Sequence, residues 1–173
     1  LHGSMANALP HAIGASFADP GRQVVAMAGD GGLSMLLGEL ITVRAYDLPV
    51  KIVLFNNSSL GMVKLEMLVE GLPDFATDSA PVDYRNVALA LGIPAVRVTD
   101  PKDLRKALAD GLDRPGPALI DVVTDPNALS IPPSISPGQV RGFATAMSKQ
   151  VLSGGMGEVM SMARSNLRNI PRP

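Results

Sequence analysis

The chain is organised around the stretch Val24-Val25-Ala26-Met27-Ala28-Gly29-Asp30-Gly31-Gly32, an apolar, β-branched run that ends abruptly in glycines and one carboxylate. A second run, Lys51-Ile52-Val53-Leu54-Phe55-Asn56-Asn57, follows it and ends in two amides. Apolar runs of this kind predict buried strands of a parallel sheet, whose carboxyl ends open into functional loops. The two runs therefore predict neighbouring strands with polar groups gathered at one end.

The segment between the two runs predicts a helix over residues 33–46, because its apolar residues recur at helical spacing, at positions 33, 36, 37, 40 and 43. A strand, helix, strand unit has a right-handed crossover, which sets its strands parallel and adjacent. Asp30 and Asn57 are therefore expected to meet at one edge of the sheet. Ligands of open α/β sheets bind at that edge.

The residues at this edge are typical of a magnesium and diphosphate site. Gly29, Gly31 and Gly32 leave room for a phosphate, and the helix that follows would offer free N–H groups to an anion. Asp30 would repel a bare diphosphate, and a divalent cation between them removes that conflict. Magnesium takes oxygen ligands and shares them among one or two protein groups, phosphates and water. Asp30, Asn57 and a main-chain carbonyl would supply the protein's share.

Ordinary turns are the main alternative interpretation of both short motifs. A Gly-Asp-Gly after a strand and an Asn-Asn at a strand end are each common in turns. Their joint occurrence, at a spacing that predicts adjacency, favours a cofactor loop. Other phosphate loops fit less well, because Ser34 stands where a Gly-x-Gly-x-x-Gly motif needs its third glycine, and no Gly-Lys-Ser/Thr occurs.

Gly29-Asp30-Gly31, followed after 24 residues by Asn56-Asn57, resembles the signature of thiamine-diphosphate enzymes. Residues 3–10, residues 55–63 and Ile131-Pro132-Pro133 are similar to the flavin-dependent, quinone-reducing pyruvate dehydrogenases, also called pyruvate oxidases. The resemblance runs over nearly the whole chain and corresponds to the C-terminal, diphosphate-binding third of such an enzyme. It implies thiamine diphosphate, Mg²⁺ and FAD as cofactors, with FAD held mainly by a domain absent here.

The resemblance also implies roles for single residues before the first strand. The main-chain carbonyl of Gly3 and the main-chain amide of Met5 would hold the aminopyrimidine ring. The Met5 side chain would wedge between the two cofactor rings and bend the cofactor for catalysis. From its residue type alone, Met5 would be a core filler.

Further roles follow for the loop after the second strand. The main-chain carbonyl of Ser59 would join Asp30 and Asn57 as a metal ligand, and Gly61 with Met62 would contact the diphosphate and the thiazolium ring. Many relatives carry an aromatic residue at the position of Met62. The resemblance places a glutamate beside the substrate at Glu66, which makes Glu66 a candidate catalytic residue with Met5. Without the resemblance, the sequence around Glu66 is equally consistent with a charged side chain exposed to solvent on a helix.

The rest of the chain predicts one α/β domain over residues 1–125, a doubly wound and mostly parallel sheet. A helical stripe occurs within residues 3–18, and Asp83 and Asp100-Pro101 are typical helix starts. Further strands are expected at residues 95–98 and 118–123. Asp121 and Asp125, near the end of the latter, are interpreted as structural.

The character of the sequence changes at residue 126. Prolines and glycines predict an extended linker over residues 126–142, and residues 143–173 predict a helical tail. The pattern of the tail favours a segment that docks on its own protein or on a sister subunit. The resemblance implies instead a peptide that binds the membrane surface, although this tail has no tryptophan.

Composition narrows the class of protein. With 46% hydrophobic residues among 173, the chain can bury one sizeable core. A net charge of −1 with scattered basic residues argues against a nucleic-acid partner, and the lack of cysteine excludes disulfides and zinc-thiolate sites. No apolar run reaches the length of a membrane span. A cytoplasmic protein, peripheral on the inner face of the cell membrane if the tail binds lipid, is therefore expected.

The expected function is that of the C-terminal, cofactor-binding portion of a quinone-linked pyruvate dehydrogenase. Such an enzyme would oxidise pyruvate to acetate and CO₂ and would assemble as a homotetramer. A chain that starts at Leu1, inside a motif, is expected to be a fragment without turnover, because the pyrimidine-activating glutamate and the flavin domain lie elsewhere. Two alternatives are an acetolactate synthase-like enzyme and a non-catalytic α/β binding module.

Overall fold

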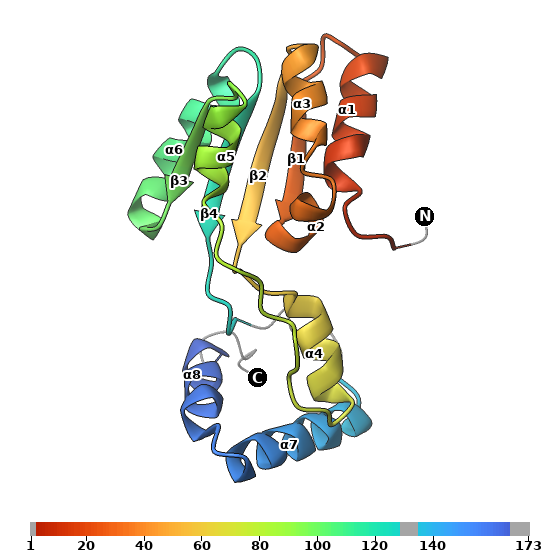
Figure 1. The fold of residues 1–173 in the computed structure, drawn as a ribbon, viewed down its shortest axis with the longest axis vertical. Helices are drawn as coiled ribbons and strands as arrows, with labels where there is room; N and C mark the ends of the chain where they lie inside the picture. The colour runs from red at the N-terminus through yellow and green to blue at the C-terminus, as the bar shows by residue number, and fades with distance from the viewer. Residues whose placement is uncertain (1–2, 129–134, 167–173) are drawn as a thin grey trace. The chain divides into compact units, whose positions relative to one another are not determined.

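The computed structural model describes residues 3–128 and 135–166. The chain forms two compact units (Figure 1). The first contains residues 1–58 and 81–124, and the second contains residues 59–80 and 125–173. The segment 59–80, which the sequence analysis includes in the α/β domain, thus belongs with the C-terminal residues.

The first unit is built on a four-stranded sheet in the order β1-β2-β4-β3, in which every pair is parallel. The strands are β1 (Val24–Gly29), β2 (Val50–Asn56), β3 (Ala95–Val98) and β4 (Ala118–Val123). The central strands β2 and β4 are buried along nearly their whole length, as their unbroken apolar runs predict. The predicted parallel α/β sheet is confirmed.

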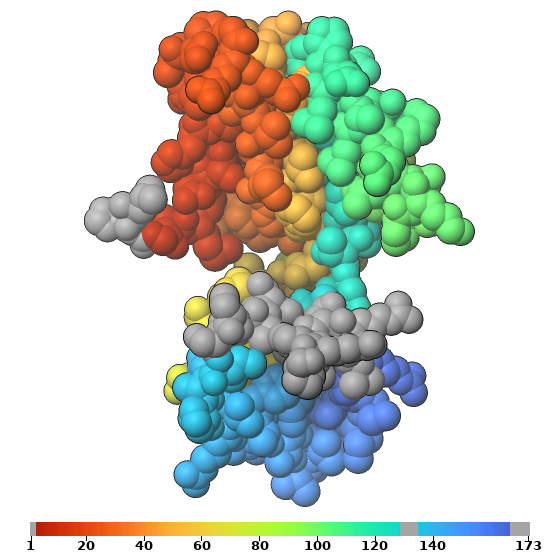
Figure 2. Space-filling model, turned by 180° about the vertical axis from the view of Figure 1, so that it is seen from behind, coloured from red at the N-terminus to blue at the C-terminus, as the bar shows by residue number. Residues whose placement is uncertain are grey.

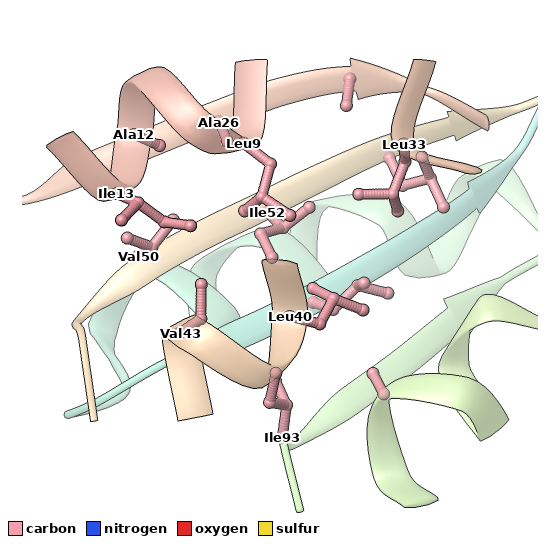
Figure 3. Close-up of a cluster of buried hydrophobic side chains, with 14 of the residues drawn as sticks. Leu9, Ala12, Ile13, Ala26, Leu33, Leu40, Val43, Val50, Ile52 and Ile93 are labelled. Atoms are coloured by element: carbon pink, nitrogen blue, oxygen red, sulfur yellow. The ribbon is translucent and has the colours of Figure 1, made fainter. Parts of the chain in front are cut away.

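Helices cover this sheet on both faces. Its helices are α1 (Ala8–Ala18), α2 (Asp30–Met35), α3 (Glu39–Ala45), α5 (Tyr84–Ala90) and α6 (Pro101–Asp113). The main core lies between the sheet and the helices of one face, where Leu40, Val43 and Ile52 are fully buried (Figure 3). A smaller core lies under α6 on the other face and contains Ala107 and Ile120.

The sheet face opposite the main core is open over β1. Val25 is 43% exposed, Met27 66% and Phe55 41%. In the space-filling view from behind, residues coloured as β1 and β2 reach the surface beside the green-teal residues of α6 (Figure 2). The reason is that α6 packs against β3 and β4. The edge strand β1 is therefore apolar on a face that none of the described helices of the first unit covers.

Two predicted helices differ from the observed ones. The single helix predicted over residues 33–46 is broken into α2 and α3, and α2 begins at Asp30. Leu36 ends α2 and is 42% exposed, so one residue of the predicted apolar stripe does not face the core. Near the N-terminus, α1 begins only at Ala8, because Ala6 has a left-handed φ of 68°.

Two predicted helix starts are confirmed. The Asp83 side chain accepts a hydrogen bond from the N–H of Asn86 at the start of α5. The Asp100 side chain accepts one from the N–H of Lys102 at the start of α6. Both are N-cap bonds that satisfy a free donor of the first turn.

The second unit contains α4 (Gly61–Val69), α7 (Pro137–Leu152) and α8 (Met156–Asn166). These helices bury Leu68, Ala146 and Met162 in a small apolar cluster. A Cβ at Gly142 would lie 1.8 Å from the carbonyl oxygen of Val69, so α7 meets the end of α4 in backbone contact at this glycine.

The predicted extended linker over residues 126–142 is wrong from Pro137 onwards. Pro137 is the first residue of α7, where a fixed φ suits a helix and no N–H is needed. Ser136 and Gln139 form a capping box. The helix α7 ends at Leu152, before Ser153 and the glycines at 154 and 155. Ile131-Pro132-Pro133 and the end of the tail, residues 167–173, lie outside the described residues.

A membrane-spanning helix is not found in the part of the chain that the structure describes, where no helix is both long and apolar enough.

Candidate functional site

The carboxyl ends of β1 and β2 bring Asp30 and Asn57 into contact. Gly29 pairs with Phe55 in the parallel register, so Asp30 follows its strand at the level where the amides follow theirs. The main-chain N–H of Asn57 donates a hydrogen bond to the Asp30 carboxylate. The two residues singled out by the strand, helix, strand pattern therefore meet at one sheet edge, as that pattern predicts.

The carboxylate of Asp30 is buried among main-chain donors. Asp30 is 4% exposed, and the N–H groups of Asn57, Asp30 itself, Gly31 and Ser58 all donate to its side chain. Burial raises the pKa of Asp30 above its ordinary 3.8, while these four hydrogen bonds favour the anion and limit the rise. The first N–H groups of α2, which the sequence assigns to a phosphate, are thus used by Asp30.

Tyr84, which the sequence analysis did not identify, packs beneath this turn. It is 5% exposed, and its hydroxyl lies 3.4 Å from the main-chain oxygen of Asp30, to which it donates. Burial raises the pKa of Tyr84, and the nearby charge of Asp30 raises it further. Its position directly after the predicted N-cap Asp83, at the start of a helix, is the one sequence feature that could have indicated this role.

A hollow of about 230 Å³ opens beside Gly29, the residue before Asp30, between the N-terminal segment, the end of β1 and α2. Met5, Gly29 and Gly32 are among its lining residues. A Cβ on Gly29 would meet no atom within 4 Å, and the φ of −83° does not require glycine, so this glycine leaves open space. Met5 is 48% exposed, which contradicts its interpretation as a core filler. Gly3, with a φ of 65°, belongs to the same segment.

The two amides of the Asn56-Asn57 pair have different environments. Asn57 is half-buried at the sheet edge, whereas Asn56 is 2% exposed and donates from its side chain to Asp121 inside the sheet. From the sequence, Asp121 is interpreted as structural and Asn56 has no predicted role. The signal it did not use is a charged residue within an otherwise apolar strand.

The remaining predicted site residues belong to the second unit, so the geometry above rests on first-unit residues alone. Ser59 is 5% exposed and its hydroxyl donates to the carbonyl oxygen of Thr77 at 3.4 Å. Gly61 is the first residue of α4. Met62, at 58%, and Glu66 on the same helix are both exposed.

The donors at the sheet edge fit Mg²⁺. Asp30 offers a carboxylate and Asn57 an amide oxygen, which are hard ligands of the kind magnesium selects. Among the described residues there is no group of three or more acidic or histidine side chains that could hold a metal ion. A cation held by these two residues has room beside Gly29 for phosphate oxygens and water as its remaining ligands.

Fold and site together define a cofactor-binding α/β domain with its ligand edge at the carboxyl ends of parallel strands. Residues 1–122 match the family model described as thiamine pyrophosphate enzyme, C-terminal TPP binding domain. The chain belongs to this family.

The relatives found by sequence comparison include several acetolactate synthases. Acetolactate synthase of Arabidopsis thaliana, a chloroplast protein, is 45% identical over 130 residues, which are 70% of this chain and 19% of that protein. Chloroplast acetolactate synthase 2 of Brassica napus is 44% identical over 130 residues, 70% of this chain and 20% of that protein. A Bacillus subtilis protein named "Putative thiamine pyrophosphate-containing protein YdaP" is 36% identical over 162 residues, 94% of this chain and 28% of that protein.

The chain thus spans less than a third of the length of these relatives. The enzymes named among them are acetolactate synthases, so the expected oxidoreductase class and pyruvate oxidase identity are replaced by the broader family of thiamine pyrophosphate enzymes.

Proposed function

We propose that the chain is the cofactor-binding part of a longer enzyme of the acetolactate synthase type. Such an enzyme decarboxylates pyruvate and joins the two-carbon remainder to a second 2-oxo acid. The identity of 44–45% to two acetolactate synthases supports this reaction over oxidation to acetate. The observation that carries the cofactor assignment is the buried Asp30 carboxylate, bonded to Asn57 across the tips of β1 and β2.

Each residue at the edge has a proposed task. Asp30 and Asn57 would bind Mg²⁺, with the main-chain carbonyl of Ser59 as a third protein ligand. Thiamine diphosphate, when bound, supplies the electron sink for decarboxylation. The chain's contribution is to orient that group and to exclude water from it. The space beside Gly29 would take the diphosphate, and Met5 would contact the rings from the wall of the hollow.

The other assignments come from the family resemblance. Gly31 and Gly32 would line the diphosphate, and the main chain of Gly3 would hold the aminopyrimidine. In the second unit, Gly61 and Met62 would contact the diphosphate and the thiazolium. Glu66 would assist proton movements around the substrate, and its exposure on α4 leaves its carboxylate accessible.

Binding and product analysis test the proposal in the full-length enzyme. We expect Mg²⁺-dependent binding of thiamine diphosphate, seen by calorimetry and lost in D30A, with D110A on the exposed face of α6 as the control. Pyruvate alone should give acetolactate and CO₂. Lack of binding by the wild-type protein would favour the non-catalytic module instead.

Oxidation of pyruvate is the second candidate, supported by the similarity of residues 3–10 and 55–63 to pyruvate oxidases. It predicts acetate as the product, bound FAD, and reduction of a quinone. The same product analysis separates the two candidates, because acetate formed together with a reduced acceptor would contradict the acetolactate proposal.

The tail is proposed to dock on its own protein, in a homo-oligomer whose subunits would share the site. Ala146 and Met162 of the tail are buried with Leu68 of α4, which supports docking over lipid binding. Co-sedimentation of the full-length protein with liposomes, with and without residues 152–173, tests this. Partitioning that depends on those residues would favour a peripheral membrane protein.

A further inference from the structure

We propose that Asp121 and Arg97 are positioning residues of the magnesium site, acting through Asn56 on the turn that presents Asn57 to Asp30. The proposal deepens the proposed function and rests on it. Neither Asp121 nor Arg97 is at the sheet edge where the metal would bind. Both lie within strands, Asp121 with a fully buried side chain and Arg97 with a side chain that is 23% exposed.

The Asp121 carboxylate joins three strands. It is fully buried in the middle of β4 and accepts one hydrogen bond from Asn56 Nδ2 on β2, at 2.9 Å. Its second oxygen accepts from Arg97 on β3, also at 2.9 Å. A buried carboxylate is stable only when it is paired and hydrogen-bonded, and apolar residues of similar volume often replace such pairs without loss of stability. Stability alone therefore does not account for the charge.

The network reaches the Asp30 turn along β2. Asn56 is held by Asp121, and the next two residues, Asn57 and Ser58, donate their N–H groups to the Asp30 carboxylate. Ser58 has a φ of 53°, a left-handed conformation that costs energy in a residue with a side chain. Its hydroxyl lies 3.4 Å from the Asn56 side-chain oxygen, to which it donates. Fixing Asn56 thus fixes the direction in which this strained turn leaves the sheet.

A second connection reaches the turn through α5. The carbonyl oxygen of Val82 accepts from Asn56 Nδ2 at 3.1 Å and from Arg97 at 2.9 Å. Two residues later Tyr84 begins α5 and contacts the main-chain oxygen of Asp30. Asn56 and Arg97 therefore hold both segments that enclose Asp30.

The test measures metal affinity separately from substrate affinity in the full-length enzyme. Variants D121N and R97M are compared with R85M, a matched control because Arg85 also pairs with Asp83, at 3.2 Å. Calorimetry gives the dissociation constant of Mg²⁺ at saturating thiamine diphosphate, and kinetics give the KM for pyruvate at saturating cofactors. We expect D121N and R97M to weaken Mg²⁺ binding by about tenfold or more, as loss of an outer-shell partner does.

The expected pattern has further parts. The KM for pyruvate should change little once Mg²⁺ saturates, R85M should match the wild type, and R97K should recover most of the affinity because it keeps the ion pair. Unchanged Mg²⁺ affinity in a folded D121N would overturn the proposal. A parallel rise in KM without recovery in R97K would also overturn it, because it would indicate a general structural role.

Two further measurements keep the test decisive. If D121N and R97M do not fold, N56A removes the link to the turn while leaving the Arg97–Asp121 ion pair, and wild-type Mg²⁺ affinity in N56A would then overturn the proposal. If the wild-type protein itself binds no Mg²⁺ with thiamine diphosphate, the proposed function fails rather than this inference alone.

Discussion

The two units each contain a buried ion pair, and the pairs differ in what else holds their partners in place. In the first unit, Arg97 and Asp121 lie 2.9 Å apart on adjacent strands whose main chains are already paired. In the second, Lys64 of α4 lies 2.7 Å from Asp74. Among the described residues, the segment that contains Asp74 pairs with another strand only through one isolated bridge, between Ser59 and Asp78. The first pair can therefore orient side chains on a backbone that the sheet already fixes. The second pair helps to hold the backbone of its own unit in place.

The largest effect is expected when the pair of the second unit is broken. The side chains of Lys64 and Asp74 are only 11% and 15% exposed, so K64M leaves a buried carboxylate without its cation. Loss of one partner of a buried pair costs about 3–5 kcal/mol. Chemical denaturation, with protection of α4 amides followed by hydrogen exchange, measures this.

The double variant K64M/D74L is the control for that prediction. It removes both charges and should recover most of the stability, because the cost comes from the unpaired charge. A K64M protein as stable as the wild type would show that the second unit does not depend on this pair, and the contrast between the units would fail.

Next in size is the backbone contact between α7 and α4. In G142A the new methyl group would overlap the carbonyl oxygen of Val69, which cannot rotate away. Overpacking of this kind costs about 1–3 kcal/mol or more. G138A is the control in the same helix, because its Cβ would meet only the Ser136 hydroxyl, at 3.8 Å. Equal denaturation midpoints for the two variants would contradict the close approach.

A smaller loss is expected from the corresponding glycine of the first unit. A Cβ at Gly111 on α6 would lie 2.8 Å from Cδ1 of Ile120, the end of a flexible side chain. Part of the overlap can be relieved by a rotamer change, and alanine also favours the helix by about 1 kcal/mol over glycine. We expect G111A to destabilise less than G142A in the same denaturation assay, and the reverse order would contradict this reasoning.

The sequence predicts correctly those features of the fold and the site that depend on residues close together in the chain. The strand runs, the N-caps Asp83 and Asp100 and the meeting of Asp30 with Asn57 all follow from local pattern and one crossover rule. The break between α2 and α3 was missed, because an apolar stripe does not show which of its residues finds the core. The capped start of α7 was missed because Pro137 was interpreted as a linker residue.

The interior network was missed for a different reason. The Asp121 carboxylate is hydrogen-bonded to Asn56, which is 65 residues away in the sequence. It is also hydrogen-bonded to Arg97 on β3, which lies between β2 and β4 in chain order. No local pattern connects these residues, since strand order β1-β2-β4-β3 must be known before they become neighbours. The roles proposed for Met5 and Glu66 came from family resemblance and stay predictions.

The smallest effect is a pH dependence of the first unit that comes from Tyr84. Burial, and after it the charge of Asp30, raises the pKa of Tyr84 above its ordinary 10.0. Between that value and the raised one, the folded protein keeps a proton that the unfolded chain has lost. The stabilisation is therefore complete below pH 10 and is lost as the pH rises through the folded pKa.

Tyr84 can be titrated separately because the chain has two tyrosines. The difference in phenolate absorbance between Y46F and Y46F/Y84F reports Tyr84 alone, and its midpoint in the folded protein should lie above 10.0. Y84F should also flatten the alkaline fall in the free energy of unfolding of the first unit. A midpoint at or below the ordinary value would mean that the phenol is solvated, and the packing of α5 against the Asp30 turn would then be wrong.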